Sequence, residues 1–329
     1  MTRFPYIREP IRALVTVVAA LVALHSVSPR VFAQRATGSI SGSVVDPSES
    51  AVAGAEVAIQ NLATGIVRSA PSNSRGYFVV PALSAGTYAM TVSKEGFQTQ
   101  TVPKMVLEVD QNVAINIVLR LGSVSETVTV FADALAVDTR DATLNTVITQ
   151  KQIAELPLNG RNVLQLMQLT PGALPGSGGF LQGATRPESM LISASGGRGN
   201  STAFVLDGGL NEDPYTEVAN VTPNPDAIQE FSFQTNNYSA KFGGRGGGVV
   251  NMVTKSGTNE FHGSLYEYLR HSKLNARNFF ASTGDGLKRN QYGVAFGGPI
   301  LRNKTFFFFS WQGTQLRQRP STLTAVVPT

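Results

Sequence analysis

The residues that could carry catalysis or bind a metal are few in this sequence. The 329-residue chain has no cysteine, which excludes disulfides, thiolate nucleophiles and thiolate metal sites. Only two of its three histidines, His262 and His271, lie beyond the first 33 residues, and neither has partners that we can place as metal ligands. We therefore interpret both as structural or solvated side chains.

Motifs for nucleotide, calcium or acyl-transfer chemistry are also missing. The sequence has no G-x-S-x-G elbow and no Gly-Lys dipeptide, which excludes a P-loop. Three oxygen-bearing residues in a turn-rich loop, Asp207, Asn211 and Asp213, lack the spacing of an EF-hand, so we assign them to turn hydrogen bonds. These absences predict a protein that is not an enzyme and that has no cofactor and no metal site.

The charge of the chain does not favour a nucleic-acid partner. The net charge is +5, but residues 1–33 hold four arginines against one glutamate and so account for +3 of it, which leaves +2 for the rest. Hydrophobic residues make up 42% of the chain, an ordinary fraction for folded protein, and the length allows two or three domains.

The first 33 residues have the pattern of a secretory signal peptide. Arg3, Arg8 and Arg12 form a positive segment, Ala13 to Leu24 is apolar, and the run Val31-Phe32-Ala33 suits cleavage before Gln34. The apolar run is shorter than the roughly 20 residues of a membrane-spanning helix. We expect export, with any membrane insertion by strands.

Residues 38–121 predict a small antiparallel β-sandwich. Some seven short apolar-alternating segments are separated by turns such as Asp46-Pro47 and Ala85-Gly86. The stretches GSVVD, AVAGAEVAI and SRGYFVVPALSAGTYAMTVSKEGF resemble the carboxypeptidase regulatory-like domain, which implies a transthyretin-like, non-catalytic sandwich.

Residues 122–138 form a linker with a short β-prone segment, which consists of Glu126, Thr127, Val128, Thr129 and Val130. Its place between two folded units suits the addition of a strand to the sheet edge of another protein. On the residues alone, a last sandwich strand that runs into a linker is the preferred interpretation.

Residues 139–257 predict a compact α+β unit. Thr149 can cap a helix over 150–156, and Asn162 can cap a second helix in which Val163, Leu166 and Met167 share a face. Short strands follow, and the unit closes on a glycine cluster that we predict to turn close to a neighbouring wall: Gly243, Gly244, Gly246, Gly247 and Gly248.

Residues 258–329 have the pattern of the first strands of a membrane β-barrel. Tyr292, Val294 and Phe296 alternate with small or polar residues, and aromatic residues gather over 306–311. A soluble sheet with a phenylalanine-rich strand is the alternative. Glu267 shares the predicted face of Phe261 and Leu265, so it would have to lie near the membrane interface.

The order of these parts resembles the TonB-dependent outer-membrane receptors, in particular the Oar-like group with an N-terminal carboxypeptidase regulatory-like domain. The matching blocks are LPLNGRNVLQLMQLTPG (156–172), FVLDGG (204–209), PDAIQEFSFQTNNYSAKFGGRGGGVVNMVTKSGTNEFHGS (225–264), LNARNFF (274–280) and FGGPILRNKTFFFFSWQG (296–313). The resemblance implies that 139–257 is a plug in the barrel lumen, that 126–130 is a TonB box, and that the partners are TonB, outer-membrane lipid and an unknown extracellular substrate.

The same resemblance implies energy-coupled uptake in the outer membrane, with the sandwich in the periplasm. After residue 257 the sequence has room for about three strands, whereas closed barrels need at least eight. We therefore expect an incomplete barrel and a fragment of a longer protein. The alternatives are a secreted or surface adhesive, carbohydrate-binding protein built from sandwich modules, and a signal-transducing receptor, which the sandwich disfavours.

Overall fold

The computed structural model describes residues 37–122, 127–129, 143–175, 190–242, 244–276, 284 and 286–317. The predicted signal peptide lies outside these residues. Among the residues described, no helix combines the length and the apolar character that a membrane span requires.

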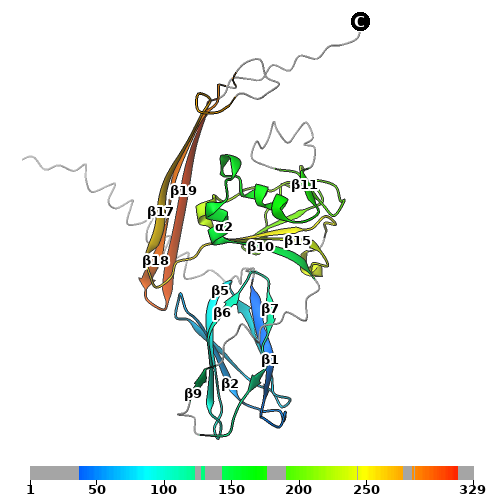
Figure 1. Cartoon of the computed structure of the whole chain (residues 1–329), viewed down its shortest axis with the longest axis vertical. Coiled ribbons are helices and arrows are strands. Elements are labelled where there is room, and N and C mark those ends of the chain that lie inside the picture. The colour runs from blue at the N-terminus through cyan, green and yellow to red at the C-terminus, as the bar shows by residue number, and fades with distance from the viewer. Residues whose placement is uncertain are drawn as a thin grey trace, which may run out of the picture. The chain divides into compact units, whose positions relative to one another are not determined.

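The first unit is a sandwich of two sheets (Figure 1). One sheet has the order β4-β1-β7, with β8 also paired to β1, and the other has the order β3-β2-β5-β6-β9. Its core is one cluster of buried side chains that includes Ile40, Val57, Phe78, Met90 and Leu107. The strands are β1 (Gly38–Val45), β2 (Glu56–Asn61), β3 (Val67–Pro71), β4 (Tyr77–Leu83), β5 (Gly86–Ser93), β6 (Thr99–Leu107), β7 (Asn112–Ala114), β8 (Ile117–Val118) and β9 (Thr127–Thr129).

The prediction of a wholly antiparallel sandwich is wrong in one respect. Strand β1 pairs in parallel with both β7 and β8, and β6 pairs in parallel with β9. Apolar alternation reports which face of a strand is buried, but it does not report the direction of the neighbouring strand. The sheets are therefore mixed.

The second unit, residues 143–254, is built on a five-stranded sheet of order β10-β15-β16-β13-β14. Its core includes Ile148, Leu164, Phe231, Phe233 and Met252, all of them almost completely buried. The sheet strands are β10 (Leu144–Thr149), β13 (Ala203–Leu206), β14 (Gly209–Leu210), β15 (Ile228–Asn236) and β16 (Val249–Thr254), and a separate pair is formed by β11 (Ala173–Pro175) and β12 (Ile192–Ala194).

Both predicted helices of this unit are present. Helix α2 (Gln150–Glu155) begins after Thr149, whose backbone N–H donates to Gln152 Oε1 at 3.0 Å. The second is the 3₁₀ helix η3 (Val163–Leu169), capped by Asn162, whose side chain accepts from the N–H of Leu164. Shorter 3₁₀ turns are η2 (Asn159–Arg161), η4 (Pro225–Ala227) and η5 (Ala240–Phe242).

The third unit is an antiparallel sheet of three long strands, in orange and red in Figure 1. Strand β17 (His262–His271) pairs with β18 (Lys288–Leu301), which pairs with β19 (Thr305–Arg317). Residues 255–261 connect β16 of the second unit to β17.

Candidate functional site

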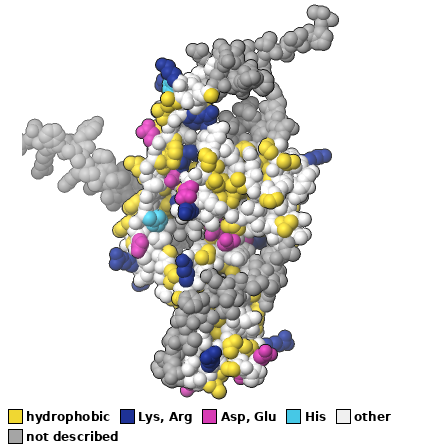
Figure 2. Space-filling model, viewed as in Figure 1, with side chains coloured by type: hydrophobic (Ala, Val, Ile, Leu, Met, Phe, Trp, Pro, Cys, Tyr) yellow, Lys and Arg dark blue, Asp and Glu magenta, His cyan; other side chains and the backbone are white. Residues whose placement is uncertain are grey.

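The three-stranded sheet has one apolar and one polar face. On the apolar face, Leu265, Val294 and Trp311 lie in register, and Leu265 is 86% exposed. Further exposed apolar residues of this face are Leu269, Phe296 and Phe309, and hydrophobic side chains appear in yellow on the left of Figure 2. Exposed apolar surface of this kind marks a membrane or protein contact. Glu267 is exposed among these residues, so its place near the membrane interface stays a prediction.

The polar face carries side chains that contact the second unit. Ser264, Ala295 and Ser310 lie in one register row, followed by the row of Tyr266, Gly293 and Gln312. Ser264 Oγ donates to Asp226 Oδ1 at 3.0 Å, and Ser310 Oγ accepts from Asn224 Nδ2 at 2.8 Å. Each of these contacts is a single hydrogen bond between polar side chains.

The turn Asn159-Gly160-Arg161 is the centre of this contact. Gly160 and Arg161 both have left-handed backbone conformations, with φ of 66° and 57°. Asn-Gly favours such turns because glycine adopts positive φ without a steric penalty. The turn is held by Arg270, whose Nη1 donates to Asn159 Oδ1 at 2.5 Å, and by Gln291, whose Nε2 donates to the carbonyl of Gly160 at 3.0 Å.

Arg161 combines an ion pair with ring contacts. It pairs with Asp226, and its Cζ lies 4.3 Å and 4.4 Å from the ring centroids of Tyr266 and Tyr268 on β17. Guanidinium groups stack on aromatic faces, and lysine does not reproduce this planar geometry. Since Arg161 is 11% exposed at its side chain, the contact is largely shielded from water.

We expect Arg161→Ala to weaken the contact by about 1–3 kcal/mol, because it leaves Asp226 without its ion-pair partner and removes both ring contacts. Arg161→Lys should recover only part of the loss. Faster hydrogen exchange of the β17 amides would measure the effect. Arg302→Ala, in the exposed turn after β18, is the control; equal exchange in all three variants would contradict a structural role for Arg161.

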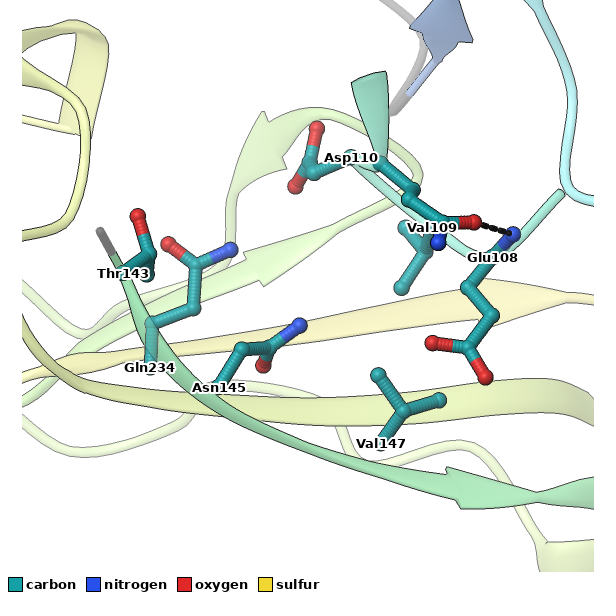
Figure 3. Close-up of a pocket in the computed structure, with 8 residues that line it drawn as sticks. Glu108, Val109, Asp110, Thr143, Asn145, Val147 and Gln234 are labelled. Carbon is teal, nitrogen blue, oxygen red and sulfur yellow. Dashed lines mark hydrogen bonds between the residues drawn. The ribbon is translucent and has the colours of Figure 1, made fainter. Parts of the chain in front are cut away.

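A second contact joins the loop after β6 to the sheet of the second unit. Asp110 pairs with Lys241 Nζ at 2.8 Å and accepts from Asn251 Nδ2 at 2.5 Å. Gln229 Nε2 donates to the carbonyl of Ala85 at 3.0 Å, and Val109 is buried. Beside this loop lies a cavity of about 350 Å³, lined by Glu108 and Asp110 of the loop and by Asn145, Val147 and Gln234 of the second unit; the Glu108 carboxylate points toward Val147 (Figure 3).

Among the titratable groups of this contact, the carboxyl of Glu230 has the pKa that is shifted furthest from its ordinary value. Burial raises the pKa of its carboxyl to about 7, and the nearby carboxylate of Glu108 acts in the same direction. The N–H of Val109, which donates to Glu230 Oε2 at 2.8 Å, opposes the shift. Burial also raises the pKa of Glu108.

The predicted partner-binding segment lies partly within the described residues. Thr127, Val128 and Thr129 form β9, and β9 pairs with Thr99, Gln100 and Thr101 of β6. The remaining two residues, Glu126 and Val130, lie outside the described residues. Whether this segment binds a partner stays a prediction.

The glycine cluster lies against the second unit's own residues. A Cβ on Gly247 would come within 2.2 Å of Ser201 Oγ, and one on Gly248 within 2.8 Å of the carbonyl oxygen of Gln234. Positions Gly244 and Gly246 face open space, and Gly243 lies outside the described residues. Their role at a boundary between plug and barrel stays a prediction.

Of the three loop residues that we assigned to turns, Asp213 forms turn hydrogen bonds, because its Oδ1 accepts from the N–H groups of Tyr215 and Thr216. The assignment is wrong for Asp207, which accepts from the N–H and hydroxyl of Thr254, a residue distant in sequence at the end of β16. Asn211 Nδ2 donates across the loop to the carbonyl of Val221.

Several residues of these contacts were not among the predicted site residues: Arg161, Asp226, Glu230, Tyr266 and Tyr268. For Arg161 the sequence offered a signal, because an Asn-Gly turn followed by a cation stands within the block 156–172. Glu230 could be suspected as a carboxylate inside an apolar strand pattern.

Two parts of the chain match known domain families. Residues 39–120 match the carboxypeptidase regulatory-like domain, and residues 253–329 match an outer membrane beta barrel domain. The chain is also 28% identical over 316 residues to the TonB-dependent transporter Oar of Myxococcus xanthus. That alignment covers 90% of this chain and 28% of the relative.

Solved structures give weaker likenesses. The siderophore receptor PirA of Acinetobacter baumannii is 20% identical, with a TM-score of 0.39, over 55% of this chain and 26% of that one. A cohesin–X-dockerin complex from Acetivibrio cellulolyticus is 22% identical, with a TM-score of 0.22, over 26% of this chain and 58% of that one.

Proposed function

We propose that this chain, a homologue of the TonB-dependent transporter Oar, acts as part of a TonB-dependent outer-membrane receptor for energy-coupled uptake of an unknown substrate. The observation that carries the proposal is the sheet β17–β19, whose outward face is apolar and whose inward face contacts the second unit through polar side chains. A membrane barrel around a plug requires these two faces. The barrel-domain match and the transporter relative support an outer-membrane location.

In this proposal each part has its own role. Residues 1–33 direct export, the transthyretin-like sandwich 38–121 lies in the periplasm, and 122–138 carries the TonB box. Residues 139–257 are the plug, and 258–329 contribute the first barrel strands, whose apolar face meets outer-membrane lipid. The transporter relative is not an enzyme, in agreement with the prediction of no catalytic activity. The alternative of a secreted adhesive, carbohydrate-binding protein is not favoured, because residues 253–329 match a barrel domain.

The proposed mechanism begins with substrate binding on the extracellular side. TonB then pairs with residues 126–130 by strand addition, and force from the inner membrane displaces the plug from the barrel strands that surround it. The contact that has to open joins the proposed plug to β17. It consists of Arg161, its ion-pair partner Asp226, and the rings of Tyr266 and Tyr268. Because this contact is made of separate polar interactions, water can replace its hydrogen bonds as they break.

Val128→Pro tests the TonB box. Proline removes a backbone N–H from the strand, so the affinity for the periplasmic domain of TonB should fall at least about tenfold in a binding titration. Val128→Thr keeps the N–H and the β-branched shape, and it should bind like the parent chain. Equal binding by the parent and the proline variant would overturn the assignment of the box.

A further inference from the structure

The edges of the sandwich differ in how they are protected against pairing with another chain. Edge strands expose unpaired backbone groups, and proteins protect them with proline, charge or short length. Strand β3, at one end of the five-stranded sheet, carries Arg68 and Pro71, and β4, at an end of the other sheet, carries Pro81. Strands β7 and β8 are three and two residues long.

Strand β9, at the opposite end of the five-stranded sheet, is as short as β7, but it lacks proline and charge. Its residues are Thr127, Val128 and Thr129, and the flanking sequence Ser123–Phe131 contains no proline and one charged residue, Glu126. In the part of the chain that the structure describes, β9 pairs only with β6, so its other edge has no strand beside it. Thr-Val-Thr is well suited to strand pairing because β-branched residues favour extended backbone.

The chain also holds β9 beside β6 through a short connection. Gln98 N–H donates to the carbonyl of Arg120 at 2.8 Å, and Phe97 forms a β-bridge with Leu121. The exit from the sandwich is thus fixed at the start of β6, a few residues before β9 begins. A short tether keeps the effective concentration of a segment near its acceptor high, so the β6–β9 pairing is favoured although it is short.

We propose that the sandwich holds the TonB box as a pre-ordered edge strand, and that TonB pairs with the outer edge of β9 while β6 remains on its inner edge. This inference rests on the proposed function and adds a role for the sandwich in it. A β-strand directs hydrogen-bonding groups to both sides, so occupation of one edge leaves the other available. A box that is already extended loses less conformational freedom when TonB binds, which favours affinity.

In the opposite hypothesis, β6 conceals the TonB box and must release it before TonB can bind. A disulfide that locks β9 to β6 distinguishes the two hypotheses, because it prevents this release. Thr101 and Thr129 are in register, and neighbouring strands lie about 4.8 Å apart, within the range that a disulfide spans. Because the chain has no cysteine, Thr101→Cys with Thr129→Cys introduces the only two thiols. The matched control is Ala58→Cys with Ser69→Cys, which links β2 to β3 away from the box.

The affinity of the full chain for the periplasmic domain of TonB is measured before and after oxidation of each pair. We expect the Thr101–Thr129 disulfide to form and the oxidised chain to bind TonB as tightly as the reduced chain, or up to about tenfold more tightly. A loss of tenfold or more on oxidation, absent from the control, would overturn the proposal in favour of concealment. Failure of the disulfide to form would also overturn it, because β9 would then not lie on β6. If the parent chain does not bind TonB, the proposed function itself fails, and this inference fails with it.

Discussion

Replacing Gly248 with alanine should lower the free energy of unfolding of the second unit by about 2–4 kcal/mol. Gly248 has a φ of 114°, which L side chains rarely adopt, and a Cβ there would lie 2.8 Å from the carbonyl oxygen of Gln234 and 3.0 Å from Phe233 Cε2. Both neighbours belong to β15, which pairs with β16 directly after this glycine. The substitution therefore strains the backbone and pushes against the central sheet. Urea unfolding and hydrogen exchange of the β16 amides would measure the loss.

The neighbouring glycines provide matched controls for this prediction. Gly246 has no left-handed φ and no atom within 4 Å of its added Cβ, so Gly246→Ala should be neutral or slightly stabilising. Gly244 has a φ of 93° in open space, so Gly244→Ala isolates backbone strain. A loss at Gly246 as large as that at Gly248 would contradict this account and would indicate that the cluster contacts something else.

The contact around Glu230 should weaken as the pH rises from about 4.5 to 7. The folded pKa of about 7 lies above the ordinary 4.5, so the folded chain keeps a proton that the unfolded chain loses in this interval. Stability is therefore fully present below the unfolded pKa and falls as the pH rises through the folded pKa. The shift corresponds to a loss on the order of 3 kcal/mol, as an upper limit. Thermal unfolding at pH 5 and pH 8 would measure it.

Glu230→Gln separates this effect from other titrating groups. Its amide oxygen can still accept from the Val109 N–H, but the side chain cannot ionise, so the difference between pH 5 and pH 8 should shrink. The groups that share the contact are Glu108, Asp110 and Lys241. Glu56→Gln, on the exposed side of β2, is the control. A pH dependence that survives in Glu230→Gln would assign the effect to Glu108, whose pKa burial also raises.

Local features of the fold could be predicted from the sequence. Thr149 and Asn162 mark helix starts because their side chains and short-range partners lie within a few residues. The alternation of Tyr292, Val294 and Phe296 predicts the apolar face of β18 for the same reason. The order and direction of strands depend on contacts between distant residues. The parallel pairs of β1 with β7 and β8 could therefore not be derived from the apolar alternation within each strand.

The site residues follow the same division. The segment 126–130 and the glycine cluster could be selected from the sequence because their signals are continuous in it, and their roles stay predictions. Arg161 and its ion-pair partner Asp226 are 65 residues apart in the sequence, and Tyr266 lies farther still from Arg161. No local pattern carries such a pairing. Glu230 is perturbed by Val109 and Glu108, which precede it by more than 100 residues.

The two faces of the sheet β17–β19 should accumulate amino-acid substitutions in different ways among homologous proteins. The outward positions, such as Leu265 and Phe309, need only remain apolar, a condition that many side chains meet. The inward positions Tyr266 and Tyr268 have to suit Arg161, so a change on one side of that contact should be accompanied by a change on the other. Substitutions along these strands are thus expected to alternate, with free exchange among apolar residues at one position and paired change at the next.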